Sequence, residues 1–146
     1  MREALTEAQA AYRQGDVPVG AVAVRGGRVI GRGHNCKEAW GDPTAHAEIL
    51  ALRQAAEDVG SRYLVDVTLY CTMEPCPMCA GALVLARVPL LVYAVDDPKA
   101  GAAGSVLDIL DWPSLNHQVR VITGVLADEA RALLQSFFKE LRQSPP

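Results

Sequence analysis

The sequence predicts an α/β fold in which helices cover a sheet of about five strands. In the second half of the chain, apolar runs of strand length alternate with segments of helical periodicity, an order that makes part of the sheet parallel. Near the amino terminus, a Gly-Gly pair separates two shorter apolar runs, as in an antiparallel hairpin. The length of 146 residues suits one domain, 1–146, with one core.

In the first half, apolar residues recur at helical spacing up to Gly15, a natural helix terminator. Two strands then flank the Gly-Gly turn. Asp42, Pro43 and Thr44 carry the signals of a second helix start. The expected elements are a helix ending before Gly15, strands at 19–24 and 29–33, a loop at 34–44 and a helix from Ala45.

The second half reads as strand, helix and strand, followed by a loop, a last strand and a long helix. The final helix has one apolar stripe, and we expect Phe137 and Phe138 on this stripe to belong to the core. The expected elements are strands at 67–72, 89–95 and 118–123, a helix at 77–87, a Gly-rich loop at 96–105, a short helix at 106–110 and a stripe of Leu126, Ala130, Leu133, Leu134, Phe137, Phe138 and Leu141.

Charge and hydropathy exclude some classes of function. The net charge of −3 argues against a protein that coats nucleic acid through bulk positive charge, although a local basic patch is compatible with it. No apolar run approaches the roughly 18 residues of a membrane-spanning helix. The amino terminus lacks the apolar centre of a signal peptide. We therefore expect a cytoplasmic protein without membrane contact, whose four cysteines are thiols or metal ligands rather than disulfides.

The stretch "EPCPMC" at 74–79 spaces two cysteines as a metal clamp. Pro77 is tolerated in a helix only within the first turn, which puts Cys76 at the N-cap and Cys79 on the same face. Unpaired N–H groups and the positive end of the helix dipole favour thiolates there. A lone C-x-x-C also occurs as a redox pair or as half of a structural zinc site. Cys36 and Cys71 form no second such pair, and we interpret them as ordinary thiols.

His46 is the expected third ligand, and Glu48 is the expected proton shuttle. At the start of their helix both side chains can face one site, although residues two apart diverge in a helix interior. Zn²⁺ bound by His46, Cys76 and Cys79 keeps an open position, where the pKa of a bound water falls to about 7. A carboxylate that is not a ligand can then move that proton. These parts describe hydrolytic deamination of an amidine-like base.

"HAE" followed by "PCPMC" resembles the H-x-E…P-C-x-x-C signature of the zinc nucleobase deaminases. Further stretches resemble, in order, the bacterial tRNA adenosine-34 deaminases: "DVPVGAV", "DPTAHAEI", "EPCPMCAGAL", "DPKAGAAGS" and "LNHQVRVITGVLADEARALL". The resemblance covers almost the whole chain. It implies a cytidine-deaminase-like three-layer α-β-α sandwich with helices on both faces of the sheet, a homodimer with one Zn²⁺ per subunit, and conversion of the wobble adenosine of a tRNA anticodon stem-loop to inosine.

The same resemblance implies roles for further residues. Asn35 would hold the nucleoside, the backbone N–H of Ala47 would contact the base, and Val19 would form a pocket wall. Asp97 and Lys99 would meet flanking nucleotides. Phe137 and Phe138 would lie near the anticodon loop, although their place on the apolar stripe also favours the core. The end of the chain, "FFKELRQSPP", has fewer basic residues than an RNA-gripping terminus would have.

Two rival functions remain open at this point. "DPTAHAE" and "EPCPMC" also resemble guanine deaminase, which would use the same zinc chemistry on a free purine. The other rival is a non-catalytic, zinc-stabilised RNA-binding subunit. Glu48 argues against it, because a structural zinc site needs no proton shuttle.

Overall fold

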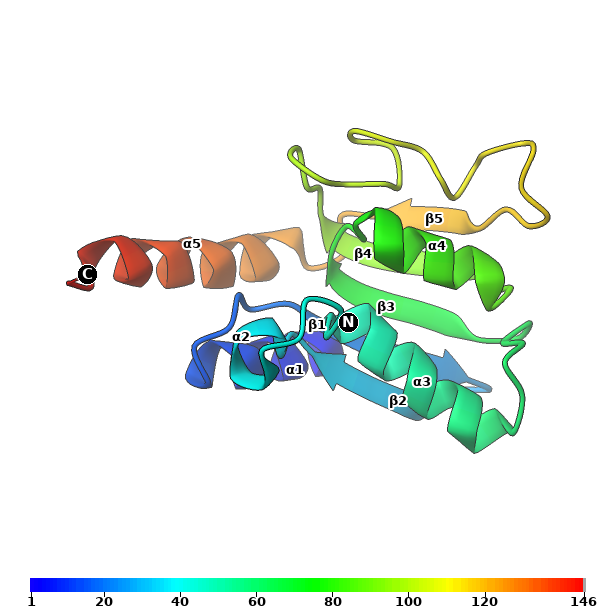
Figure 1. Ribbon diagram of the computed structural model, residues 1–146, viewed down its shortest axis with the longest axis horizontal. Helices are drawn as coiled ribbons and strands as arrows, with labels where there is room; N and C mark the ends of the chain where they lie inside the picture. The colour runs from blue at the N-terminus through cyan, green and yellow to red at the C-terminus, as the bar shows by residue number, and fades with distance from the viewer. Residues whose placement is uncertain (146) are drawn as a thin grey trace.

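The computed structural model describes residues 1–145 and contains one five-stranded mixed sheet (Figure 1). The strand order is β2-β1-β3-β4-β5. β1 is antiparallel to both β2 and β3, whereas β3, β4 and β5 run parallel. The predicted α/β class and mixed sheet are confirmed. The strands are β1 (Gly20–Arg25), β2 (Arg28–His34), β3 (Thr68–Met73), β4 (Leu90–Val95) and β5 (Arg120–Thr123).

Helices cover both faces of this sheet, as the three-layer prediction requires. α3 and α4 lie next to each other in front of the sheet in Figure 1, and both start near the same edge. α1 and α5 contact each other on the opposite face. There the rings of Tyr12 and Phe137 pack edge to face, with 5.6 Å between the ring centroids. The helices are α1 (Arg2–Arg13), α2 (Lys37–Trp40), α3 (Ala47–Val59), α4 (Pro77–Leu85) and α5 (Ala127–Gln143).

Glycines in β2 let α3 approach the sheet closely. A Cβ atom added at Gly33 would lie 2.8 Å from the backbone nitrogen of Ala51 and closer still to the carbonyl oxygen of Ala47. One at Gly31 would lie 2.9 Å from the nitrogen of Ala55. Real Cβ atoms do not approach backbone atoms so closely, so only glycine permits this spacing. β2 thereby sets the position of α3, whose first residues carry the site.

The loop predicted at 34–44 contains a helix, α2, which the local sequence does not announce. The buried carboxylate of Asp16 accepts the backbone N–H groups of Glu38 (2.7 Å) and Ala39 (3.1 Å) at its start. Helix starts need such acceptors. Because Asp16 lies more than 20 residues away in sequence, local patterns could not predict this cap.

The short helix predicted at 106–110 is wrong. These residues form turns and an isolated bridge between Ala103 and Asp108. The backbone N–H groups of Val106 and Leu107 both bond the carbonyl of Gly101, at 2.9 and 3.1 Å. Backbone groups committed to Gly101 are not available for a helical ladder.

The apolar stripe of α5 is only partly in the core. Ala130 and Phe137 are buried, but Phe138 is 39% exposed and Leu141 is 58% exposed. Figure 1 shows why, because α5 continues well past the edge of the sheet toward the carboxyl terminus. The expectation that Phe137 and Phe138 belong to the core is therefore confirmed for Phe137 and wrong for Phe138. Pro146, the final residue of the predicted domain, lies outside the described residues. Within residues 1–145, no helix is both long and apolar enough to cross a membrane.

Candidate metal centre and substrate pocket

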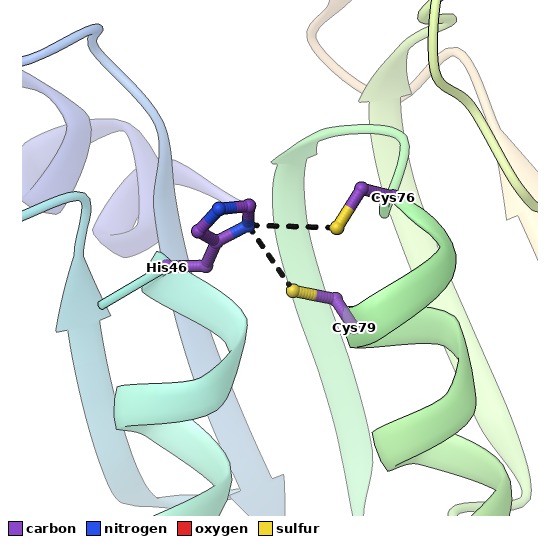
Figure 2. Close-up of side chains that lie close together, drawn as sticks. All are labelled: His46, Cys76 and Cys79. Carbon is purple, nitrogen blue, oxygen red and sulfur yellow. Dashed lines mark hydrogen bonds between the residues drawn. The ribbon is translucent and has the colours of Figure 1, made fainter. Parts of the chain in front are cut away.

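The starts of α3 and α4 bring the three predicted metal ligands together (Figure 2). His46 is the N-cap of α3 and Cys76 is the N-cap of α4, both with extended backbone. Pro77 is the first residue of α4, as predicted from its missing N–H group. Cys79 follows in the first turn, so both sulfurs face the imidazole of His46.

The spacing of these atoms fits a tetrahedral metal. The Nδ1 atom of His46 lies 3.6 Å from the sulfur of Cys76 and 3.4 Å from that of Cys79, and all three ligand atoms lie within 4.8 Å of one another. With Zn–S bonds of about 2.3 Å and Zn–N bonds of about 2.0–2.1 Å, tetrahedral geometry separates sulfur and nitrogen by about 3.5 Å. The donor set and the spacing between nitrogen and sulfur therefore suit zinc.

The two thiols differ in protonation. The adjacent Cys79 thiol donates to the Cys76 sulfur and, together with His46, lowers the pKa of Cys76 to about 3. The pKa of Cys79 is raised, chiefly because its proton is held by Cys76 and further because it is buried. Of the two sulfurs, that of Cys76 therefore favours the thiolate, the form that binds metal.

His46 and Glu48 also influence each other. The hydrogen bond to Cys76 raises the pKa of His46, and the Glu48 carboxylate adds to this effect against the opposing effect of burial. Glu48 is 4% exposed, and burial raises the pKa of its carboxyl group above the ordinary value. A buried carboxyl group with a raised pKa can both accept and return a proton.

A cavity of about 250 Å³ opens over this group. It is slightly smaller than the ~300–1,000 Å³ typical of pockets for drug-sized ligands, which suits a single base. His46, Cys76 and Glu48 contribute to its wall, so the ligand group faces the cavity. The other lining residues are Val17, Val19, Asn35, Lys37, Ala47, Met73, Glu74, Asp97 and Ala100.

Four of the five residues predicted to bind substrate line this cavity, namely Val19, Asn35, Ala47 and Asp97. Lys99 is exposed and borders a separate groove on α5, together with Arg131 and Phe138. The structure thus places Lys99 at a second surface, beside a positive charge and an aromatic ring.

Hydrogen bonds fix the orientation of Asn35. Its amide nitrogen donates to the carbonyl of Val17 (3.2 Å), and its amide oxygen accepts the N–H of Lys37 (3.1 Å). Ala47 is the first residue of α3, and its N–H group has no carbonyl partner within the helix. Both groups are therefore held in place before a ligand enters.

Sequence reasoning missed Glu74 and Lys37 in the cavity wall. Glu74 stands inside "EPCPMC", where an acidic residue directly after a buried strand was the signal available. Lys37 gives no such signal, since its position depends on α2 and its long-range cap. Cys36 and Cys71 are buried thiols outside the ligand group, in agreement with their interpretation as ordinary thiols.

Comparisons with known proteins agree with this geometry. Residues 1–142 match the family of MafB19-like deaminases. The tRNA-specific adenosine deaminase of Bacillus subtilis (strain 168) is 46% identical over 143 residues, which cover 98% of this chain and 89% of that protein. The tRNA-specific adenosine deaminase of Aquifex aeolicus (strain VF5) is 45% identical over 144 residues, covering 99% of this chain and 95% of that protein.

Comparison with solved structures also finds similarity to deaminases. A structure from a study of A-to-I editing by tRNA:A34 deaminases at the wobble position of transfer RNA superimposes with a TM-score of 0.88 at 42% identity, covering 92% of this chain and 97% of that one. The guanine deaminase from Nitrosomonas europaea superimposes with a TM-score of 0.80 at 26% identity, covering 93% and 81%. The fold is therefore shared with both, and the sequence is nearer to the tRNA enzymes.

Proposed function

This chain belongs to the family of tRNA-specific adenosine deaminases, and we propose that it converts the wobble adenosine of a tRNA anticodon to inosine. The observation that carries the proposal is the grouping of His46, Cys76 and Cys79 within 4.8 Å on the wall of a base-sized cavity that also contains Glu48. In the reaction, the oxygen of a water adds to C6 of adenine, the bond from C6 to the amino nitrogen breaks, and ammonia leaves.

We propose Zn²⁺, one per chain, as the metal held by these three residues. The mixed sulfur and nitrogen donors and their tetrahedral spacing support zinc over the oxygen-seeking cations, and a hydrolytic reaction needs no redox metal. When bound, zinc supplies a Lewis acid that lowers the pKa of a coordinated water to about 7.

Glu48 would move the protons. Its buried carboxylate takes a proton from the attacking water and delivers it to the ring nitrogen next to C6. It then passes a proton to the departing amino group, so that ammonia rather than an amide ion leaves. The raised pKa supports this double use, because the group must be a base in one step and an acid in the next.

Asn35, Ala47 and Val19 would hold the base. The oriented amide of Asn35 and the unpaired N–H of Ala47 supply hydrogen-bonding groups at the cavity wall, and Val19 supplies an apolar surface. An anticodon base must leave its stack to enter, at a cost of a few kcal/mol that these contacts offset. Asp97 at the rim and Lys99 in the neighbouring groove would meet the flanking nucleotides.

We also propose that the chain forms a homodimer in the cytoplasm, the compartment where mature bacterial tRNA is found. α4 and the loop after β4 each carry exposed apolar side chains, and the two segments are joined by a hydrogen bond from the Ala102 N–H to the Pro75 carbonyl (2.8 Å). Such surfaces mark protein interfaces. They are Met78 (36%), Leu85 (73%), Val106 (53%), Leu107 (49%) and Trp112 (57% exposed). Light scattering should give the mass of two chains, and Leu85→Glu should shift it to one.

Product analysis with a panel of substrates tests the function. The zinc-loaded protein is incubated separately with an anticodon stem-loop carrying a wobble adenosine, with free adenosine, with guanine and with cytidine. The proposal predicts inosine in the stem-loop alone. Ammonia from guanine with an untouched stem-loop would favour guanine deaminase, to which the fold is also similar. No product from any substrate would favour a non-catalytic RNA-binding subunit.

A further inference from the structure

A buried carboxylate next to the metal ligands holds one rim of the cavity, the turn at Asp97–Ala100. Glu74 is only 3% exposed. One of its oxygens accepts the N–H of Asp97 (3.0 Å) and the hydroxyl of Ser105, and the other accepts the N–H groups of Ala103 (3.0 Å) and Ser105 (3.1 Å). A single side chain therefore fixes both ends of the loop that runs from Asp97 to Ser105.

The anchor is rigid because its own backbone is fixed. The N–H of Glu74 bonds the carbonyl of Val95 at the end of β4 (2.9 Å), and the next carbonyl, that of Pro75, accepts the N–H of Ala102 (2.8 Å). Cys76 follows directly. Residues 74–76 thus carry both Glu74, which anchors the rim, and the metal ligand Cys76. The distance between the rim and the metal ligands is therefore set within three consecutive residues.

Gly101 shows how closely the loop fits over this carboxylate. A Cβ atom at position 101 would overlap the carboxyl group of Glu74 and lie 2.5 Å from the carbonyl oxygen of Asp97. Only glycine leaves room for the carboxylate beneath the loop. The loop can therefore lie over the Glu74 carboxylate only because position 101 is a glycine.

The negative charge of Glu74, rather than the space that its side chain fills, holds the loop. A buried carboxylate is costly unless hydrogen bonds satisfy it, and an apolar side chain would fill the same space more cheaply. Here all four donors come from one loop.

The ordered rim faces the ligand. Asp97 and Ala100 line the cavity, as does Glu74 itself. The Asp97 carboxylate also accepts the N–H groups of Lys99 (3.0 Å) and Ala100 (3.2 Å), so the turn at the rim is held from within. Without Glu74, the turn would keep its internal hydrogen bonds, but its height, that is, its distance from the rest of the cavity wall, would no longer be fixed.

We propose that Glu74 is a positioning residue that sets the height of the Asp97–Ala100 rim and thereby the affinity for the nucleotides on either side of the target base. This inference rests on the proposed function, since the rim affects affinity only if a polynucleotide passes over it. Both carboxylate oxygens of Glu74 are engaged by the loop, so its effect falls on binding rather than on the chemical step.

Steady-state kinetics on the anticodon stem-loop test this role. In Glu74→Gln, an amide N–H₂ group replaces one acceptor, and we expect the KM to rise about tenfold, the scale of one lost hydrogen bond to a charged group. The kcat should change less than the KM, and the zinc content should stay at one per chain. Gly101→Ala should give the same pattern, because the added methyl group would push the loop away from the Glu74 carboxylate. Glu57→Gln, on the exposed face of α3, is the matched control.

Two further readouts separate positioning from general destabilisation. Hydrogen exchange should show faster exchange at Ala103 and Ser105 in Glu74→Gln, with β3 and β4 still protected. Ser105→Thr, which keeps the hydroxyl, should restore the KM that Ser105→Ala raises. An unchanged KM in both Glu74→Gln and Gly101→Ala, or loss of zinc in parallel with activity, would overturn the role of Glu74. Absence of inosine with the wild-type protein would instead overturn the proposed function.

Discussion

Replacing Gly33 with alanine places a methyl group between β2 and the start of α3. The added Cβ atom would stand 2.8 Å from the nitrogen of Ala51 and closer to the carbonyl oxygen of Ala47, whereas ordinary contacts begin at 3.4 Å. Both clashes are with backbone atoms, which no change of rotamer can relieve. Relieving the contact with Ala51 alone takes 0.6 Å, the difference between 2.8 and 3.4 Å, and the closer contact with Ala47 requires α3 to move further still.

This displacement acts on stability and on activity. Overpacking costs about 1–3 kcal/mol of unfolding free energy, which for a chain of this size lowers Tm by about 3–4 °C per kcal/mol. The first residues of α3 are also those that carry His46 and Glu48. Because a shift of about 1 Å in a catalytic group costs up to ~10²-fold in rate, we expect kcat/KM to fall by ~10- to 100-fold and zinc to bind more weakly.

Gly31→Ala is the matched comparison. Its methyl group would meet α3 at Ala51 and Ala55, one turn further from the metal ligands, with similar overlap. Thermal denaturation should therefore show similar losses of Tm for both variants, while kcat/KM and zinc affinity fall more in Gly33→Ala. If Gly33→Ala keeps the Tm and activity of wild type, or Gly31→Ala loses as much activity, then β2 does not set the position of the site.

The remaining predictions concern the site itself. Glu48→Gln should keep zinc and fold normally but lose about 10²- to 10⁴-fold in kcat, measured as inosine formation, because the proton shuttle is gone. Zinc affinity, measured by competition with a chelator, should fall as pH falls. The pKa values of His46 and Cys79 are both raised, so protons compete with the metal for these two ligands up to a higher pH than usual, whereas Cys76, with a pKa of about 3, stays available. A pH-independent affinity between pH 5 and 8 would contradict this. Asp16→Asn should lower the unfolding free energy by about 1–2 kcal/mol through loss of the α2 cap, as measured by urea denaturation, and an unchanged midpoint would show that α2 does not depend on Asp16.

The core of the site was predictable because local rules decide it. Pro77 can stand only at a helix start, and Asp42, Pro43 and Thr44 mark another, so the ends of both helices followed from short stretches of sequence. His46, Cys76 and Cys79 lie at those ends. Their meeting point required only that both helices start at the same edge of the sheet.

The parts that escaped prediction depend on contacts distant in sequence. α2 exists because Asp16 caps it from another segment, and the turns at 101–107 exist because Gly101 and Glu74 capture their backbone groups. Exposure of Phe138 follows from how far α5 extends beyond the sheet, which periodicity alone does not encode. α2 has no local signal, whereas at 106–110 and along α5 a helical or apolar pattern was present but the tertiary structure overruled it or left it exposed.

The central claim is that the group of His46, Cys76, Cys79 and Glu48 uses water to deaminate an adenosine held in an anticodon loop. The most direct test incubates the zinc-loaded protein with a stem-loop carrying a wobble adenosine in ¹⁸O-labelled water, and follows labelled inosine and ammonia together, with Glu48→Gln as the control. We predict one labelled oxygen at C6 for each ammonia released by the wild-type protein, and only trace product with the control. A stem-loop that stays unlabelled, or equal labelling with Glu48→Gln, would contradict the assigned reaction or the assigned proton shuttle.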